Sequence, residues 1–340
     1  MSDRTIVALG CSQTSDYSFL LPITALFWRR VGFEPLAIIV GDHKDSGSLA
    51  WSNDPKTKVT FDQLIAHRIP TYSVSAIDGY PIATMAQNVR QHAAGLRIVS
   101  DFGNKFDTEL VIDENDWVMP ADADLWPLRP EFYTQHENSP YRAVSYYWNG
   151  DHFVGKTAFL KAIAAGKRTQ TIPTCHVAMR AKDWRETYGL NVGENLYDAV
   201  KRTLDIWFRT YPADSFNTWM SDQDIMTANL CRQPWFPTGT PPDDGGTHAS
   251  GDVLFVGRRG HPPVDRLCRS VYESWVAQTF AEGGARLRLA DPARWTDAHV
   301  FRAPFADDNW MRLLMLIDAY IPEHGTWARG YRNEYVEAGK

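Results

Sequence analysis

Two aspartates follow a run of apolar residues in the segment VMPADADLWPL. Asp122 and Asp124 are separated by one residue, at the end of a stretch that is typical of a buried strand. Ligands of open α/β sheets bind beyond the carboxyl ends of the strands, so both carboxylates can face one crevice there. Two close carboxylates repel each other unless a cation compensates them. Oxygen ligands of this kind suit Mg²⁺ or Mn²⁺ beside a substrate phosphate, and the segment predicts such a site.

The alternative for this segment is a solvated turn after a strand, because Asp is common in turns. The flanking pattern favours the metal site. A buried strand precedes the pair, the apolar residues LWPL follow it, and strand–helix–strand units lie upstream.

A second acidic segment, SDQDIMTANL, has the pattern of a helix start and contains Asp222, Gln223 and Asp224. Asp222 could simply cap the helix, and Asp224 would interact favourably with the helix dipole in the first turn. The segment lies roughly one hundred residues after Asp122 and Asp124. This pairing of two acidic segments favours a functional interpretation.

The elements that must position these residues begin with a βαβ unit. An apolar run at 5–10, a helical pattern at 18–33 and a second apolar run at 35–41 predict a mostly parallel sheet. A polar loop is expected at 42–58. We then expect a helix within 60–69, a strand at 71–76, a helix at 81–95 and a strand at 116–124.

The second half is less regular. It predicts strands at 143–148 and 172–179, a helix at 194–211, and a long irregular stretch rich in Pro, Gly and Asp at 235–266. The fold class that follows is α/β, with a central mixed, mostly parallel sheet flanked by helices and a nucleotide-binding first half.

The segment VMPADADLWPL resembles the Asp-x-Asp segment of nucleotide-sugar-dependent glycosyltransferases of the GT-A fold. SDQDIMTANL is similar to the Asp-Gln-Asp-(Ile/Leu)-Leu-Asn motif of the glycogenin-like and lipooligosaccharide galactosyltransferase-like retaining enzymes. The chain departs from that motif at Met226 and Thr227, where the family has Leu and Asn. The resemblance covers the two motifs and the order of elements through about residue 230.

The resemblance implies a single GT-A domain over 1–340, with a nucleotide-sugar half at 1–130 and an acceptor half with a C-terminal extension at 131–340. It implies transfer of a sugar, with retention, from a nucleotide-diphosphate donor (a UDP-sugar) to a glycan hydroxyl. The cofactor would be Mn²⁺ or Mg²⁺. Asp222 and Gln223 would face the anomeric centre and the acceptor.

The resemblance also implies a third metal ligand, often a His, near the end of the chain. His299 in TDAHVFRAPF is the preferred candidate, and His261 and His248 are the alternatives. A single His is more often a hydrogen-bonded polar residue than a ligand, which is the competing interpretation for each of them.

Donor contacts are expected in the loop after the first strand, at Ser12, Thr14 and Tyr17, although Tyr17 could equally be a core or surface aromatic. Arg90 could reach the donor's phosphates or sugar, since a guanidinium pairs with such groups in a bidentate way. A solvated Arg on a helix face is the alternative. Weaker candidates for phosphate or acceptor contacts are Lys105, Trp148, Asn149, Asp151, His176, Arg258 and Arg259.

Composition excludes several classes of protein. The formal net charge is −6 without a Lys/Arg block, which argues against nucleic-acid binding. Four scattered Cys predict reduced thiols in a cytoplasmic protein. The start lacks a signal-peptide pattern, and the apolar stretch WMRLLMLIDAYI is too short and interrupted to be an integral membrane segment.

Two other functions compete with sugar transfer. A metal-dependent phosphohydrolase or nucleotidyltransferase also uses paired Asp at a strand end, but the common phosphatase motif is D-x-D-x-T on the first strand. A catalytically inactive carbohydrate-binding module is permitted by the thirteen Trp. Such a module would leave the two acidic segments unexplained.

Overall fold

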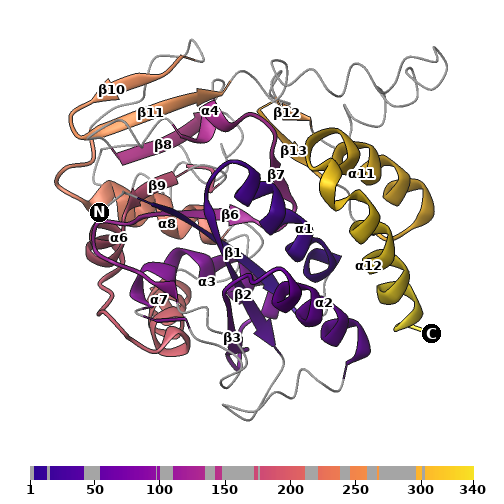
Figure 1. Cartoon of the computed structure of the whole chain (residues 1–340). Helices are drawn as coiled ribbons and strands as arrows, with labels where there is room; N and C mark the ends of the chain where they lie inside the picture. The colour runs from indigo at the N-terminus through magenta and orange to yellow at the C-terminus, as the bar shows by residue number, and fades with distance from the viewer. Residues whose placement is uncertain are drawn as a thin grey trace.

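The computed structural model describes residues 4–13, 16–41, 54–96, 98–99, 110–134, 142–147, 172–174, 177–210, 221–237, 246–258, 266–267, 296–300 and 303–340. Its main sheet contains eight strands, drawn across the middle of Figure 1. These are β1 (Thr5–Ser12), β2 (Glu34–Gly41), β3 (Thr71–Ser75), β6 (Trp117–Asp122), β8 (Arg142–Tyr147), β9 (Val177–Arg180), β10 (His248–Ser250) and β11 (Val253–Arg258).

The strand order is β10-β11-β8-β9-β6-β1-β2-β3. Strands β3, β2, β1 and β6 run parallel to one another. Strand β9 pairs antiparallel with both β6 and β8, β8 runs parallel to β11, and β10 is antiparallel to β11. The predicted α/β class with a mixed, mostly parallel sheet is confirmed.

Two small sheets accompany the main one. The first pairs β4 (Ile98–Val99) with β5 (Leu110–Val111). The second has the order β12-β13-β7 and consists of β12 (Arg266–Leu267), β13 (Asp297–His299) and β7 (Leu125–Pro127). Because β7 follows β6 directly, this sheet brings residues 297–299 to the carboxyl end of β6.

The described helices are α1 (Asp16–Arg30), α2 (Pro55–Ala66), α3 (Ile82–Val89), η2 (Arg90–Gly95), α4 (Pro130–Tyr133), α6 (Ala181–Tyr188), α7 (Leu196–Thr210), α8 (Ser221–Arg232), α11 (Asp307–Tyr320), η6 (Pro322–His324) and α12 (Gly325–Glu337). Helices α3, α6, α7 and α8 lie on one side of the sheet, and α1, α2, α11 and α12 on the other (Figure 1). No helix of the described ranges is long and apolar enough to cross a membrane.

The alternation of side chains along β1 explains the two-sided core. Ile6 and Ala8 belong to the cluster under α3, α6, α7 and α8, whereas Val7 and Leu9 belong to the cluster under α1. A central parallel strand is buried on both faces, so its sequence is continuously apolar. This is why the sequence predicts β1 well.

Four expectations differ from the structure. The strand predicted at 172–179 begins later, because β9 spans Val177–Arg180 and residues 172–174 are not in a strand. The pattern at 81–95 is not one α-helix, because the chain tightens into the 3-10 helix η2 at Arg90. The stretch 235–266 is not irregular throughout, since it contains β10 and β11. The loop predicted at 42–58 ends early, because Asp54 caps α2 and Pro55 begins it.

The burial of His92, on η2, predicts that the folded state loses stability in acid. It is fully buried between the backbone oxygen of Asn88 (3.0 Å) and the hydroxyl of Thr203 (2.8 Å). Burial lowers its pKa from 6.5 to about 4. Between about pH 6.5 and pH 4, His92 is therefore protonated in the unfolded chain but neutral in the folded chain. The free energy of unfolding falls as the pH drops through this range. The expected loss is on the order of 3 kcal/mol.

Urea unfolding at several pH values tests this expectation. His92→Gln should flatten the dependence of unfolding free energy on pH between about 6.5 and 4. His248→Gln is the matched control, because His248 lies on the edge strand β10 and is only partly buried. Equal slopes for wild type and His92→Gln would contradict the assignment.

Candidate functional site

The two aspartates of the first motif lie at the end of β6. Asp122 is the last residue of the strand and pairs in register with Gly10 of β1. Asp124 follows in the turn to β7. The hydroxyl of Thr24 on α1 fixes this turn, because it donates to the backbone oxygen of Ala123 (2.5 Å) and accepts from the indole of Trp126 (2.9 Å).

His299 reaches the same place from the other end of the chain. Strand β13 pairs antiparallel with β7, which sets His299 opposite Leu125. The backbone N–H of Val300 donates to the backbone oxygen of Asp124 (2.9 Å). As a result, His299 Nε2 lies 3.0 Å from Asp124 Oδ2.

Asp122, Asp124 and His299 form a group that could hold a metal ion. One ligand atom from each residue lies within 4.8 Å of the others. The side chains of Asp122 and His299 are 33% and 34% exposed, whereas that of Asp124 is 4% exposed. Asp124 is therefore the buried member of the cluster, whereas Asp122 and His299 are partly exposed to solvent. Asp124 is buried because the turn into β7 and the strand that carries His299 cover it.

The second motif begins α8, as predicted. Asp222 is 2% exposed and Asp224 is fully buried, while Gln223 is half-buried. Consecutive residues of a helix are rotated by about 100°, so Asp222 and Asp224 point to different sides of α8. The amide oxygen of Gln223 is buried and has no hydrogen-bond partner among the described residues.

Arg90 joins the two motifs. Its side chain is 3% exposed; Nη1 pairs with Asp122, and Nη2 donates to Asp222 (2.5 Å) and to the hydroxyl of Thr174 (3.2 Å). The remaining guanidinium nitrogen, Nε, is buried without a described partner. The strand end of the first motif and the helix start of the second are thus bridged by one guanidinium.

The residue after Arg90 holds the same helix start through its backbone. Gln91 donates from Nε2 to the backbone oxygen of Asp222 (2.8 Å) and accepts from the hydroxyl of Tyr188 on α6 (2.5 Å). Asn88 on α3 donates to the hydroxyl of Ser221 (3.0 Å). The first turn of α8 is therefore fixed against α3, η2 and α6.

Charges within this cluster are strongly coupled. Burial raises the pKa of Asp222, and the positive charge of Arg90 acts in the opposite direction. Burial alone would lower the pKa of Arg90, but Asp122 and Asp222 outweigh it and the pKa is raised. Asp122, Asp124 and Asp222 with Arg90 are three carboxylates and one guanidinium, which together carry a net charge of −2 when ionised. A divalent cation would balance that charge.

Gly10 allows the two sides of the site to approach. A Cβ atom at this position would lie 2.4 Å from the backbone oxygen of Ala86 and 3.5 Å from Cβ of Arg90. Any larger residue would push α3 away from β1. The glycine that ends the first apolar run thus brings Arg90 within reach of Asp122.

The expected donor contacts lie partly outside the described residues. Ser12 is buried at the end of β1, and Tyr17 is half-buried on the first turn of α1 against the core. His248 lies on the edge strand β10, which β11, β8 and β9 separate from β6 and its carboxylates. The described residues do not include Thr14, Lys105, Trp148, Asn149, Asp151, His176, Arg259 and His261, nor do they include the side chain of Arg258.

Several residues of the site had no signal in the sequence. Gln91 on η2, Thr174 in a turn and Tyr188 on α6 are ordinary polar or aromatic residues. Only packing brings Gln91 and Thr174 to Asp222, and Tyr188 to Gln91. The change from α3 to η2 at Arg90 is the one local feature that marks this point, since 3-10 segments within helices often occur at functional sites.

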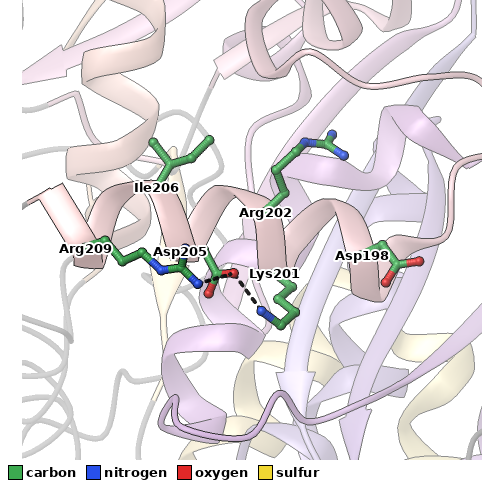
Figure 2. Close-up of a pocket in the computed structure, with 6 residues that line it drawn as sticks. All are labelled: Asp198, Lys201, Arg202, Asp205, Ile206 and Arg209. Atoms are coloured by element: carbon green, nitrogen blue, oxygen red, sulfur yellow. Dashed lines mark hydrogen bonds and ion pairs between the residues drawn. The ribbon is translucent and has the colours of Figure 1, made fainter.

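A separate hollow runs along α7, shown in Figure 2. Four of its five charged lining residues are paired within the protein. Asp205 accepts from Lys201 (2.6 Å), Arg209 (3.4 Å) and Tyr80 (2.8 Å). Arg202 pairs with Glu194. All its lining residues come from one helix and none belongs to the carboxylate cluster, which makes it a poor candidate for the reaction centre.

Comparison with known proteins gives structural similarity only. No protein-family model matches the chain, and no curated protein sequence matches it. A crystal structure of the galactosyltransferase LgtC in complex with donor and acceptor sugar analogues is 13% identical, covers 96% of this chain and 95% of its own, and has a TM-score of 0.40. An active-site mutant of LgtC has the same identity and coverage, with a TM-score of 0.41.

Proposed function

We propose that this protein is a metal-dependent glycosyltransferase that moves a sugar from a nucleotide-diphosphate donor, a UDP-sugar, to a hydroxyl group of a glycan. The observation that carries the proposal is the Asp122–Asp124–His299 cluster, joined through Arg90 to Asp222. It combines a cation site at a strand end with an acidic helix start. A phosphohydrolase explains the first of these features, but not the second.

Asp122, Asp124 and His299 would hold the metal. Two carboxylate oxygens and an imidazole nitrogen form a mixed donor set, which suits Mn²⁺ better than Mg²⁺, because Mg²⁺ prefers oxygen ligands and retained water. The bound cation would neutralise charge that develops on the diphosphate leaving group. The net charge of the surrounding groups supports a divalent ion.

The protein side chains would position the donor sugar and the acceptor. Gln223 offers an amide oxygen that has no described partner, so a donor group of a ligand can satisfy it. We assign Asp222 and Gln223 to the anomeric centre, with Asp224 buried behind them on the same helix turn. Ser12, Thr14 and Tyr17 are proposed to contact the nucleotide. Most of the catalysis would then come from positioning and preorganised charge.

A panel of nucleotide sugars tests the function directly. The protein is incubated with each donor and a set of glycan acceptors in Mn²⁺ or in EDTA, and both free nucleotide and glycosylated product are measured. Transfer with one donor in Mn²⁺ but not in EDTA is the expected result. Phosphate or pyrophosphate release without a glycoside would instead identify a phosphohydrolase or nucleotidyltransferase, and glycan binding without turnover would identify a binding module.

The stereochemistry of the product gives a further prediction. An inverting enzyme needs a general base behind the acceptor hydroxyl. Asp222 is paired with Arg90 and Asp224 is fully buried, so neither carboxylate is free to act as that base, which favours retention. NMR coupling of the product's anomeric proton should match that of the donor. An inverted coupling would assign the base role to Asp222 or Asp224 and leave Gln223 as a hydrogen-bonding residue.

A further inference from the structure

Arg90 has both ends of its guanidinium bound to carboxylates of the protein. Nη1 is paired with Asp122 and Nη2 with Asp222, and Thr174 accepts from Nη2 as well. Only 3% of the side chain is exposed, and Nε is buried. Both terminal nitrogens are already bonded to protein carboxylates and the side chain is nearly buried, so the geometry favours a bridge within the protein over a direct donor contact.

We propose that Arg90 is a positioning residue that fixes Asp222 relative to Asp122, and thereby sets the sugar-facing residues at a defined place relative to the metal-binding residues. This inference rests on the proposed glycosyltransferase function. It replaces the expectation that Arg90 contacts the donor's phosphates or sugar.

The requirement for arginine follows from the shape of the group. A guanidinium is a rigid planar fork whose two terminal nitrogens can each bind a different carboxylate. A lysine ammonium is a single point charge on a flexible stem, so it keeps the charge but cannot hold two carboxylates in one fixed arrangement. Arg90→Lys therefore separates the geometric role from the electrostatic one.

The backbone around Arg90 makes the bridge stiff. Gly10 lets α3 approach β1 closely next to the Cβ atom of Arg90. The following residue, Gln91, is held by Tyr188 and binds the backbone of Asp222. Asp222 at the start of α8 is thus held twice: Arg90 binds its side chain, and Gln91 binds its backbone oxygen.

This arrangement affects the reaction without touching the substrate. One oxygen of Asp122 is bound by Arg90, which restrains the orientation of this carboxylate in the cluster. Asp222, on the other terminal nitrogen, begins the turn that also carries Gln223. A displacement of about 1 Å in such a group can lower a rate on the order of 10²-fold.

Steady-state kinetics of Arg90→Lys test the proposal. We expect kcat to fall on the order of 10²-fold while KM for the nucleotide sugar stays within about threefold, because a misplaced catalytic group affects the transition state more than ground-state binding. In an Asp222→Asn background, Arg90→Lys should cause little further loss. A rise of about tenfold or more in donor KM with kcat retained would identify a direct donor contact and overturn the proposal.

Arg4→Lys is the matched control. Arg4 also bridges two carboxylates, Asp116 (2.8 Å) and Glu34 (3.2 Å), at the amino ends of the strands whose carboxyl ends carry the site. The same substitution there should leave kcat and KM unchanged. Equal losses of kcat in Arg4→Lys and Arg90→Lys would mean that a general weakening of the sheet is responsible, and the positioning role would be rejected.

Thr174→Val provides a milder variant if Arg90→Lys does not fold. It removes the hydroxyl that accepts from Arg90 and lies 3.5 Å from Asp222, with little change in volume. A severalfold lower kcat at unchanged donor KM is expected, and an unchanged kcat would contradict the proposal. Failure of the proposed function is distinguishable, because in that case the wild type itself would transfer no sugar from any donor in the panel.

Discussion

Asp122→Asn and Asp124→Asn should each lower metal-dependent turnover on the order of 10²–10³-fold. Each replaces a charged ligand atom of the cluster by a neutral amide at nearly the same volume. The loss is of the size seen when one group that stabilises developing charge is removed. Activity measured over a range of Mn²⁺ concentrations checks the expectation.

The two variants should differ in their effect on the fold. Asp122 is 33% exposed, whereas Asp124 is 4% exposed beside His299, so Asp124→Asn should also lower the free energy of unfolding. Asp116→Asn is the matched control, because this carboxylate lies at the amino end of the same strand and pairs with Arg4. Near-normal turnover in both Asp122→Asn and Asp124→Asn would refute the metal site.

His299→Ala should raise the Mn²⁺ concentration needed for half-maximal activity by at least 10–100-fold, the range seen when even an outer contact of a metal site is lost.

Isothermal titration of Mn²⁺ checks the affinity without any substrate. His248→Ala is the control for loss of an imidazole, because His248 lies on β10 at the far edge of the sheet. An unchanged titration for His299→Ala together with a shifted one for His261→Ala would move the third ligand to residue 261.

The first half of the fold is well predicted by sequence because its signals are local. Strands β1 and β2 are continuous apolar runs, since a central parallel strand is buried on both faces. Helix α1 ends where two basic residues are followed by Gly32, whose φ of +90° suits a glycine. Each of these elements is defined by residues adjacent in the chain.

The second half is less well predicted because its elements depend on distant partners. Strands β10 and β11 lie within a stretch rich in Pro, Gly and Asp, and β11 is stabilised by pairing with β8, more than one hundred residues earlier. Helix α12 packs Tyr331 and Tyr335 against Phe19 of α1, a partner near the start of the chain. A sequence pattern indicates which residues are buried, but it does not indicate which distant element packs over them.

The same distinction applies to the site. Asp122, Asp124 and His299 were predicted as one group, and they do lie together in the structure. Their chemistry is visible in the residue types. The position of Arg90 between Asp122 and Asp222 was not predicted, because an Arg on a helix has the same sequence pattern whether its partner is water, a ligand or a buried carboxylate. The catalytic roles of these residues remain predictions.

The pairing of β13 with β7 has a consequence for biosynthesis. It joins residues 125–127 to residues 297–299, so the group of side chains that could hold a cation spans about half of the 340 residues. Chains emerge from the ribosome N-terminus first, and contacts between distant segments form late because a long loop must close. A nascent chain would therefore expose Asp122 and Asp124 without their imidazole until residue 299 has been translated. The three-residue group would be complete only once β13 has paired with β7.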